Sequence, residues 1–173
     1  TWFIGVSRYG FNLRVNLSPM STTLRPMPEN DLLPWLEYSN SEYEADRITA
    51  GDSPEQAAEK AAETMREFFP GGHPADNQFV YQIVSDDAVV GALWIGSFTS
   101  ERPNEWWVWE IEIDEEHRGK GHGRAAMMLA EGIAREHGAI KIGLNVFGHN
   151  TAAQNLYVSL GFTTTAVNMS KQL

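Results

Sequence analysis

Apolar residues recur at helical spacing in two stretches of the first half of the chain. The second stretch opens with a serine cap, a first-turn proline and a glutamine placed for a capping box, and it stops at a proline followed by two glycines. Short runs rich in β-branched and aromatic residues indicate strands, two of them joined by a tight turn at Asp86-Asp87. The expected elements of this half are a strand at 21–26, helices at 30–48 and 53–69, and strands at 78–85, 88–97 and 106–114.

In the second half of the chain strands and helices alternate, and a glycine-rich loop at 118–124 lies between a strand and a helix. Gly138 and Gly161 stand where the two helices of this half should end. The expected elements are a helix at 123–137, a strand at 140–147, a helix at 151–160 and a final strand after Gly161. The whole order, β-α-α-β-β-β-α-β-α-β, predicts a single α/β domain in which helices flank a mixed, mainly antiparallel sheet.

The first 20 residues contain no charged segment followed by an apolar one, so we expect no signal peptide there. We interpret 1–20 as an N-terminal extension, native or not, or else as a structural arm, with Met20 as a candidate natural start. The domain is then expected at 21–173. No apolar run approaches the roughly 18 residues that span a bilayer, so no membrane segment is expected.

Composition narrows the chemistry. There is no cysteine, which excludes disulfides, thiolate metal sites and a cysteine nucleophile, and which fits a cytoplasmic location. The formal net charge is −10, and residues 21–76 hold 12 acidic and 4 basic side chains. Such a surface repels phosphates, so nucleic acid is not expected as a partner. It favours a cationic partner, although acidity that serves only solubility fits the composition equally well.

Three glycines at alternate positions in the loop 118–124 leave backbone N–H groups uncovered. Together with the positive end of the following helix, these groups predict a pyrophosphate site. Lys120 is not followed by Ser or Thr, so the loop is not a P-loop. Residues 121–126 formally satisfy the dinucleotide fingerprint, but 140–145 offers no acidic residue for a ribose and four expected strands precede the loop. A nicotinamide site is therefore the weaker interpretation.

The run IEIDEEHRGKGHGRAAMMLAEGIAREHG resembles the acetyl-CoA loop of the GNAT superfamily of N-acetyltransferases. The family pattern R/Q-x-x-G-x-G/A falls here on Arg118, Gly121 and Gly123. Further along, NTAAQNLYVSLGF resembles the second signature of that family, a helix that starts at asparagine, carries a tyrosine and ends in Leu-Gly-Phe. The resemblance covers residues 79–165 well and the N-terminal helices only in layout. It implies an acyl-CoA acyltransferase fold.

The same resemblance implies roles for individual residues. The pantetheine arm of acetyl-CoA would pair with the backbone at Ile111–Ile113, and the Ile113 N–H would polarise the acetyl carbonyl. Tyr157 would protonate the departing thiolate, although a tyrosine at this spacing is also a common core residue. Asn150 fits both a helix cap and a contact to the coenzyme. The residues expected to bind acetyl-CoA are Ile111, Ile113, Arg118, Gly119, Lys120, Gly121, His122, Gly123, Arg124, Asn150 and Asn155.

A general base is less clearly marked. Strict alternation along 106–114 divides the strand into one face with Trp107, Trp109, Ile111 and Ile113 and another with Val108, Glu110, Glu112 and Asp114. Glutamates are unexpected in a strand central enough to hold a thioester. Glu110 is therefore the first candidate base and Glu105 the second, with a pKa raised by burial or with a water between base and amine. A pair of glutamates that simply face solvent is the alternative.

Two other groups of side chains invite functional interpretations. The five histidines show no ligand spacing, so no metal is expected. The tryptophans at 35, 94, 106, 107 and 109 either fill the core or line an acceptor pocket that holds a cation against their rings.

The expected activity is transfer of an acetyl group from acetyl-CoA directly to a primary amine within a ternary complex. The acceptor would be cationic, either a small molecule or a protein amino group. One alternative is a non-catalytic sensor that only binds acyl-CoA. Another is an aminoacyl-tRNA acetyltransferase, which would require a basic face. The sequence names no acceptor and no oligomeric state, although homodimers are common in the family that it resembles.

Overall fold

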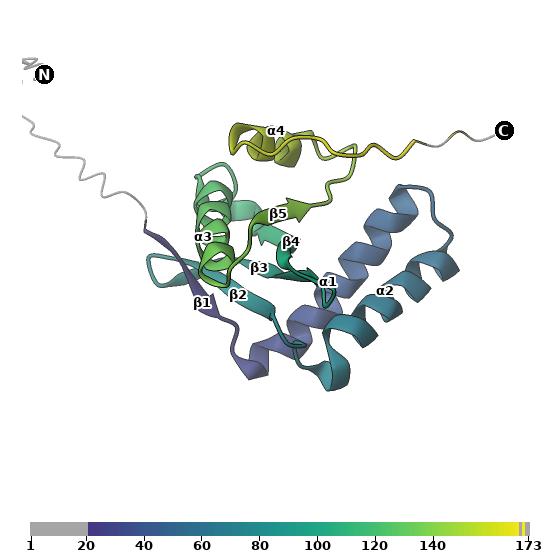
Figure 1. Cartoon of the computed structure of the whole chain (residues 1–173), viewed down its shortest axis with the longest axis horizontal. Helices are drawn as coiled ribbons and strands as arrows, with labels where there is room; N and C mark the ends of the chain where they lie inside the picture. The colour runs from purple at the N-terminus through teal and green to yellow at the C-terminus, as the bar shows by residue number, and fades with distance from the viewer. Residues whose placement is uncertain (1–20, 170, 172–173) are drawn as a thin grey trace, which may run out of the picture.

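The computed structural model describes residues 21–169 and 171. This part of the chain forms a mixed sheet with helices on both faces (Figure 1). The strands are β1 (Thr22–Pro26), β2 (Gln78–Ser85), β3 (Ala88–Thr99), β4 (Arg102–Ile113) and β5 (Lys141–Leu144). The α-helices are α1 (Glu29–Thr49), α2 (Pro54–Phe68), α3 (His122–Glu136) and α4 (Thr151–Ser159), with short 3₁₀ turns at Pro70–Gly72 and Glu115–His117.

The strands lie in the order β1-β2-β3-β4-β5. The first four strands pair antiparallel, whereas β4 and β5 are parallel and pair only over Glu105–Val108 and Lys141–Leu144. The β2–β3 turn is tight because Asp86 and Asp87 both adopt positive φ, as a two-residue type I′ hairpin requires. The expected fold class, mixed and mainly antiparallel, is confirmed.

Each face of the sheet has its own apolar core. On one face, α3 presents small residues at a spacing of four, which lets the helix approach the strands closely. This core contains Ala126, Met127, Ala130, Ala134, Leu93, Ile95, Trp106, Val108 and Tyr157. On the other face, α1 and α2 cover a second core of Leu32, Leu36, Phe68, Phe69, Val80 and Trp94.

A β-bulge in β4 corrects the strict alternation expected for this strand. Trp94 of β3 pairs with Glu110 and the next residue, Ile95, pairs with Val108, so Trp109 is an extra residue in β4. The bulge moves the side chains after it to the opposite face. Val108 therefore shares the α3 face with Ile111 and Ile113, while Trp107, Trp109, Glu110 and Glu112 lie toward α1 and α2.

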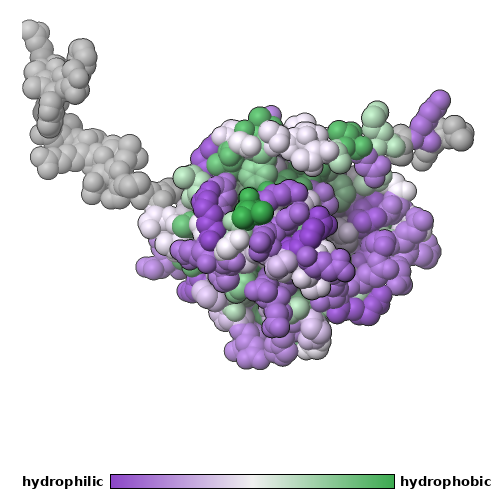
Figure 2. Space-filling model, in the orientation of Figure 1, coloured by the Kyte–Doolittle hydropathy of each residue, from purple (hydrophilic) through white to green (hydrophobic). Residues whose placement is uncertain are grey.

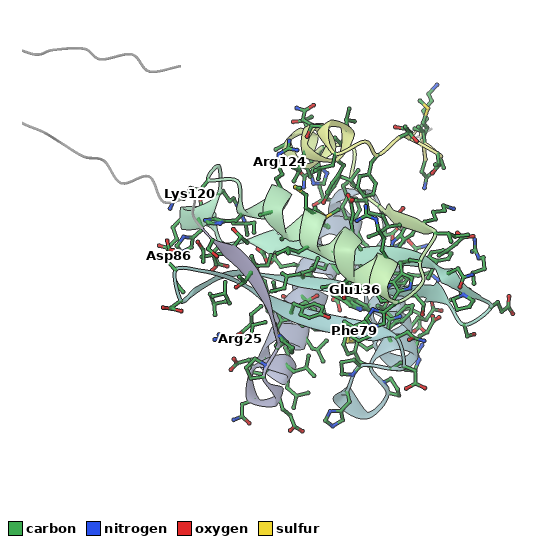
Figure 3. All side chains as sticks on the ribbon, turned by 60° about the vertical axis from the view of Figure 1, so that its left-hand side comes forward. Arg25, Phe79, Asp86, Lys120, Arg124 and Glu136 are labelled. Atoms are coloured by element: carbon green, nitrogen blue, oxygen red, sulfur yellow. The ribbon has the colours of Figure 1, made fainter. Side chains whose placement is uncertain are left out.

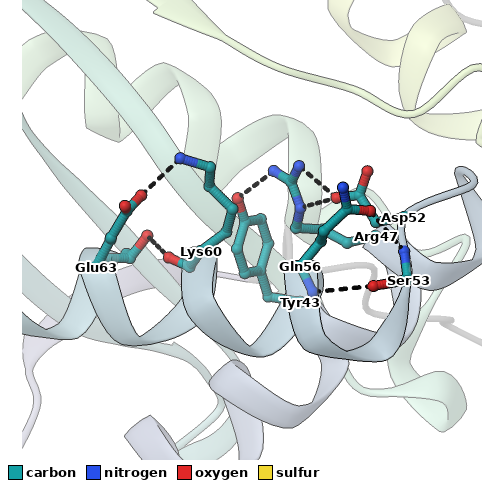
Figure 4. A network of polar contacts seen from close by, with 8 residues as sticks. Tyr43, Arg47, Asp52, Ser53, Gln56, Lys60 and Glu63 are labelled. Atoms are coloured by element: carbon teal, nitrogen blue, oxygen red, sulfur yellow. Dashed lines mark hydrogen bonds and ion pairs between the residues drawn. The ribbon is translucent and has the colours of Figure 1, made fainter.

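A polar network joins the end of α1 to the start of α2 (Figure 4). Arg47 bonds Asp52, through Nε at 2.6 Å, and the Tyr43 hydroxyl at 3.0 Å. Ser53 and Gln56 form the expected capping box, with each side chain accepting from the backbone N–H of the other residue. These local bonds fix the turn between the two helices that cover the second core.

The final expected strand is not formed. Residues 163–169 have no regular structure and are exposed. Their β-branched composition favours an extended backbone, but a strand also needs a partner, and β5 pairs only with β4 in the described structure. The expected N-terminal extension, 1–20, lies outside the described residues. Within the residues described, no helix is both long and apolar enough to cross a membrane.

Candidate active site

The glycine-rich loop presents a row of backbone N–H groups at the start of α3. Gly119 and Gly121 have φ of 73° and 93°, a left-handed conformation that other residues adopt only with strain. Gly121 caps α3, so the helix begins at His122, one residue earlier than expected. In the part of the chain that the structure covers, no atom accepts a hydrogen bond from the N–H groups of 119–124. Free amides at a helix start form an anion site.

Three exposed cations surround this loop. Arg118 Nε donates to the Ile113 carbonyl at 2.8 Å, and Lys120 Nζ donates to the Glu116 carbonyl at 2.8 Å. Arg124 donates to Ser159 Oγ of α4 at 2.5 Å. Lys120 and Arg124 project from the same end of α3 (Figure 3). The loop 118–124 thus contains three positive side chains, of which Arg118 also lies 3.7 Å from Glu112.

His122 does not belong to the surface of this site. Its side chain is 2% exposed, and its Nδ1 lies 3.0 Å from Thr22 Oγ1 of β1. Only the backbone N–H of His122 is available to a ligand in the loop. The side chain instead ties the first turn of α3 to the edge of the sheet.

Beyond Val108, no described strand pairs with the outer edge of β4, next to the loop. The Asp114 N–H donates to the Val90 carbonyl of β3 at 3.0 Å. In an antiparallel ladder the backbone N–H groups of every second residue point to the same neighbouring strand, so the N–H of Glu112 also points to β3. The Glu112 carbonyl lies directly beneath Gly91 of β3, in agreement with this phase. The N–H groups of Ile111 and Ile113 therefore point to the other edge, where β5 has already ended. An extended ligand could pair there as an added strand.

Helix α4 packs against the α3 core through Leu156 and Tyr157. Asn150 caps the helix by accepting from the Ala153 N–H at 3.1 Å, which confirms its capping role, and Asn155 is exposed. Tyr157 is 9% exposed and packs in the α3 core, as the core interpretation of this residue expects. Its hydroxyl has no partner among the residues described, yet it is not sealed from solvent. Burial raises the pKa of the phenol, which keeps it protonated.

On the opposite face of β4, Glu110 lies under α1. One carboxyl oxygen, Oε2, accepts from the hydroxyl of Ser39, which is 5% exposed. Burial raises the pKa of Glu110 from 4.5 to about 7; the hydrogen bond from Ser39 opposes this shift, and repulsion from Glu112 and Glu42 adds to it. Glu110 therefore does not face solvent freely, and its pKa suits a general base near neutral pH.

The second candidate base has a different environment. Glu105 is bonded by Lys141 at 2.9 Å and Arg102 at 3.3 Å, and these contacts, with Lys141 first, lower its pKa. A carboxylate held by two cations is a poor proton acceptor. The hydroxyl of Tyr38 donates a hydrogen bond to Oε1 of Glu112 at 2.9 Å. This hydrogen bond, together with burial and repulsion from nearby carboxylates, raises the pKa of Tyr38 to about 12.

The tryptophans differ in their burial. Trp94 and Trp106 are 4% and 2% exposed and belong to the two cores. Trp107 and Trp109 are half-buried on the α1–α2 face, and Trp109 packs 4.4 Å from Phe68 between ring centres. The Nε1 atoms of Trp35 and Trp109 are buried without a described partner. Trp35 and Trp109 pack against the second core, as the core interpretation of these rings expects.

Sequence reasoning missed Ser39 and Tyr38. Their contacts cross 71 and 74 residues of chain, which no local pattern reveals. One signal was present, since Ser39 continues the buried stripe of Leu32 and Leu36 on α1, where an apolar residue is the rule. Across the described residues, no group of three His, Asp or Glu side chains is placed to hold a metal ion.

Comparison with known proteins gives consistent matches over most of the chain. The acetyltransferase (GNAT) family matches residues 35–162. The Bacillus subtilis (strain 168) protein named "Uncharacterized N-acetyltransferase YycN" is 30% identical over 156 residues, covering 89% of this chain and 100% of that protein. The crystal structure of YycN superimposes with a TM-score of 0.79, covering 88% of this chain and 99% of that one. The aminoglycoside N-acetyltransferase AAC(6')-Iy, solved in complex with CoA, shares the fold at 13% identity, with a TM-score of 0.54 over 89% of this chain and 95% of that one.

Proposed function

Because this chain belongs to the acetyltransferase (GNAT) family, we propose that it transfers an acetyl group from acetyl-CoA directly to a primary amine while both substrates are bound. The observation that carries the proposal is Glu110. It is a half-buried carboxyl group whose pKa is raised to about 7, mainly by burial, and no described strand pairs with the outer edge of β4 at the neighbouring residue, Ile111. This arrangement supports a proton acceptor and a donor site on the two sides of one strand.

The donor would occupy the loop and the open edge of β4. The pyrophosphate would accept from the N–H groups of 119–124, with Arg118, Lys120 and Arg124 supplying positive charge. The pantetheine arm is an extended chain with amide groups, which suits the N–H groups of Ile111 and Ile113. CoA in a protein of the same fold supports this choice of donor.

The reaction needs a neutral amine. Glu110 would take one proton from the ammonium group, directly or through a water, and the amine nitrogen would then attack the thioester carbonyl. The Ile113 N–H would stabilise the charge that develops on the carbonyl oxygen. As the new C–N bond forms, the C–S bond breaks, and Tyr157 would give its proton to the departing thiolate. The nitrogen then loses its second proton, which restores Tyr157 directly or through water, and solvent removes the proton held by Glu110, so that one proton is released overall.

The acceptor would be a cationic amine that enters over α1 and α2. The face of the molecule formed by these helices is strongly hydrophilic (Figure 2), and residues 21–76 hold 12 acidic and 4 basic side chains. The half-buried rings of Trp107 and Trp109 add surfaces that attract cations. The same acidity disfavours an aminoacyl-tRNA acceptor. A sensor that only binds acyl-CoA would have no use for a carboxyl group buried at this cost.

The test is acetyl transfer to a panel of amines, followed by free-thiol release and by the mass of the product. We expect transfer by the wild-type protein and a loss in kcat of about 10²-fold or more for Glu110→Gln. Glu105→Gln is the matched control, because it removes a carboxylate of the same strand that is already neutralised by Lys141 and Arg102. Binding of acetyl-CoA without transfer to any amine would favour the sensor, and no binding would refute the proposal.

A further inference from the structure

Ser39 occupies an unusual place on α1. The helix buries Leu32, Leu36 and Ser39, a spacing of four and then three residues that follows one face of a helix. Ser39 is 5% exposed, in a position where a leucine would extend the apolar stripe. Burying a hydroxyl group there is unfavourable unless the group is hydrogen-bonded.

The hydroxyl of Ser39 does not bond to its own helix. Serines inside helices commonly donate to a carbonyl one turn earlier, and Ser41 does so, to the Tyr38 carbonyl at 2.7 Å. Ser39 instead donates to Oε2 of Glu110 on β4. The hydroxyl of Ser39 therefore orients the carboxyl group of Glu110.

The two oxygens of that carboxyl group differ in their surroundings. Oε2 is held by Ser39, while no described residue donates to Oε1. Oε1 is nevertheless not among the buried atoms that lack a partner, so it remains open to water or a ligand. The hydrogen bond thus selects which oxygen is available.

We propose that Ser39 is a positioning residue for acetyl transfer, which holds Oε2 so that Oε1 is presented to the acceptor amine. This inference rests on the proposed role of Glu110 as general base. The hydroxyl also donates to the ionised form of the carboxyl group, which is the form that accepts a proton. Ser39 therefore favours both the right orientation and the right charge state.

The charged groups around Glu110 define what loss of Ser39 does. Glu42 and Tyr38 of α1 and Glu112 of β4 lie within electrostatic range, and Trp94, the residue of β3 that pairs with Glu110, carries no charge. The carboxylates all oppose ionisation of Glu110. Without the hydroxyl of Ser39, the pKa of Glu110 must rise further.

The experiment compares Ser39→Ala and Ser39→Thr with Ser41→Ala, a control that removes an exposed serine of the same helix. The pKa of Glu110 is measured by ¹³C NMR of labelled glutamate carboxyls, with Glu110→Gln assigning the signal. Acetyl transfer to the best amine of the panel is followed against pH in parallel. In Ser39→Ala we expect the NMR pKa and the acid limb of kcat/KM to move up together by about one pH unit, the effect of one hydrogen bond to a charged group. Ser39→Thr, which keeps the hydroxyl, should restore most of the shift, and Ser41→Ala should show none.

Two results would separate the possible failures. If the pKa of Glu110 and the acid limb both stay in place in Ser39→Ala, Ser39 is only a buried structural residue and the inference is wrong. If the NMR pKa moves while the acid limb does not follow, Ser39 does tune Glu110 but Glu110 is not the base, and the proposed mechanism fails instead. The affinity for acetyl-CoA, measured by calorimetry, should be the same in the wild type and in the three serine variants.

Discussion

Leu156 of α4 lies against Gly123 of α3, with its Cδ2 atom 3.5 Å from the position that a Cβ at residue 123 would occupy. The bond from Arg124 to Ser159 joins the same two helices one residue further on. The first turn of α3 is therefore braced by α4, and the backbone amides of the loop are held in place before any ligand arrives. A pre-organised anion site costs less ordering on binding.

A carboxylate placed in this loop should block the donor. In Gly123→Glu and Gly121→Glu, the new charge lies where the pyrophosphate would sit, so we expect the affinity for acetyl-CoA to fall at least about tenfold. Gly132→Glu is the control, since position 132 lies on the same helix with nothing within 4 Å. Calorimetry gives the affinities and thermal unfolding confirms the fold. Equal affinity in the loop variants and in the control would show that the loop does not bind acetyl-CoA.

Tyr157→Phe should separate catalysis from binding. The hydroxyl has no partner among the described residues, so its removal leaves the packing of the core intact. A proton donor acts only in the transition state, so kcat should fall on the order of 10²-fold while the dissociation constant of acetyl-CoA changes little. Tyr81→Phe is the matched control, because Tyr81 is another part-buried tyrosine against the same core. Normal turnover by a folded Tyr157→Phe protein would leave Tyr157 with a structural role alone.

Glu110 should make the protein less stable as the pH rises. Its pKa is about 7 in the folded protein, against a usual value of 4.5, so between these values the folded state holds a proton that the unfolded chain has lost. Raising the pH through this window favours unfolding, and the loss is complete above about pH 7, with a magnitude of about 3 kcal/mol. Glu110→Gln removes the effect.

Urea unfolding of both proteins at pH 5 and pH 8 measures this difference. The free energy of unfolding of Glu110→Gln should gain on that of the wild type between the two pH values. A constant difference would mean that the pKa of Glu110 is not raised, and the proposed base would lose its main support.

Charge on the α1–α2 face should assist capture of the acceptor. Screening lengths fall from about 10 Å at 0.1 M salt to about 3 Å at 1 M, so kcat/KM for a cationic amine should decrease over this range while kcat stays nearly constant. Glu42→Gln should lower kcat/KM more than Glu63→Gln, because Glu42 acts on Glu110 through space while Glu63 is already paired with Lys60. A salt-independent kcat/KM, or a best acceptor with net negative charge, would show that the acidity serves solubility.

The ends of several elements are predictable from local signals in the sequence. The start of α2 depends on Ser53 and Gln56, which bond each other across three residues, and the hairpin turn depends on Asp86 and Asp87 alone. The glycines of the loop likewise act through their own φ angles. Such features are predictable because the residues that form them are adjacent in the chain.

Other features depend on partners that are distant in the chain. Nothing in the run around Trp109 marks it as an extra residue, since the bulge exists only relative to the register with β3. For the same reason, Glu110 could be selected as a candidate base from the sequence, but the face of the sheet on which it lies could not be predicted. Ser39 could not be found either, because its hydrogen bond to Glu110 spans 71 residues. The prediction of a final strand is wrong for the opposite reason, because residues 163–169 have the composition of a strand but no pairing partner among the described residues.

The bulge in β4 shifts the alternation of side chains by one residue. Side chains alternate between the two faces of the sheet up to Trp109, Glu110 then lies on the same face as Trp109, and alternation resumes from Glu110 onward. Deletion of Trp109 would restore regular alternation, with Val108 and Ile111 on the α3 face and Glu110 still on the α1 face. What the extra residue provides is a second side chain on the α1 face, next to Glu110. The bulge therefore places an aromatic ring beside the carboxyl group, an arrangement that regular alternation does not allow for two consecutive residues.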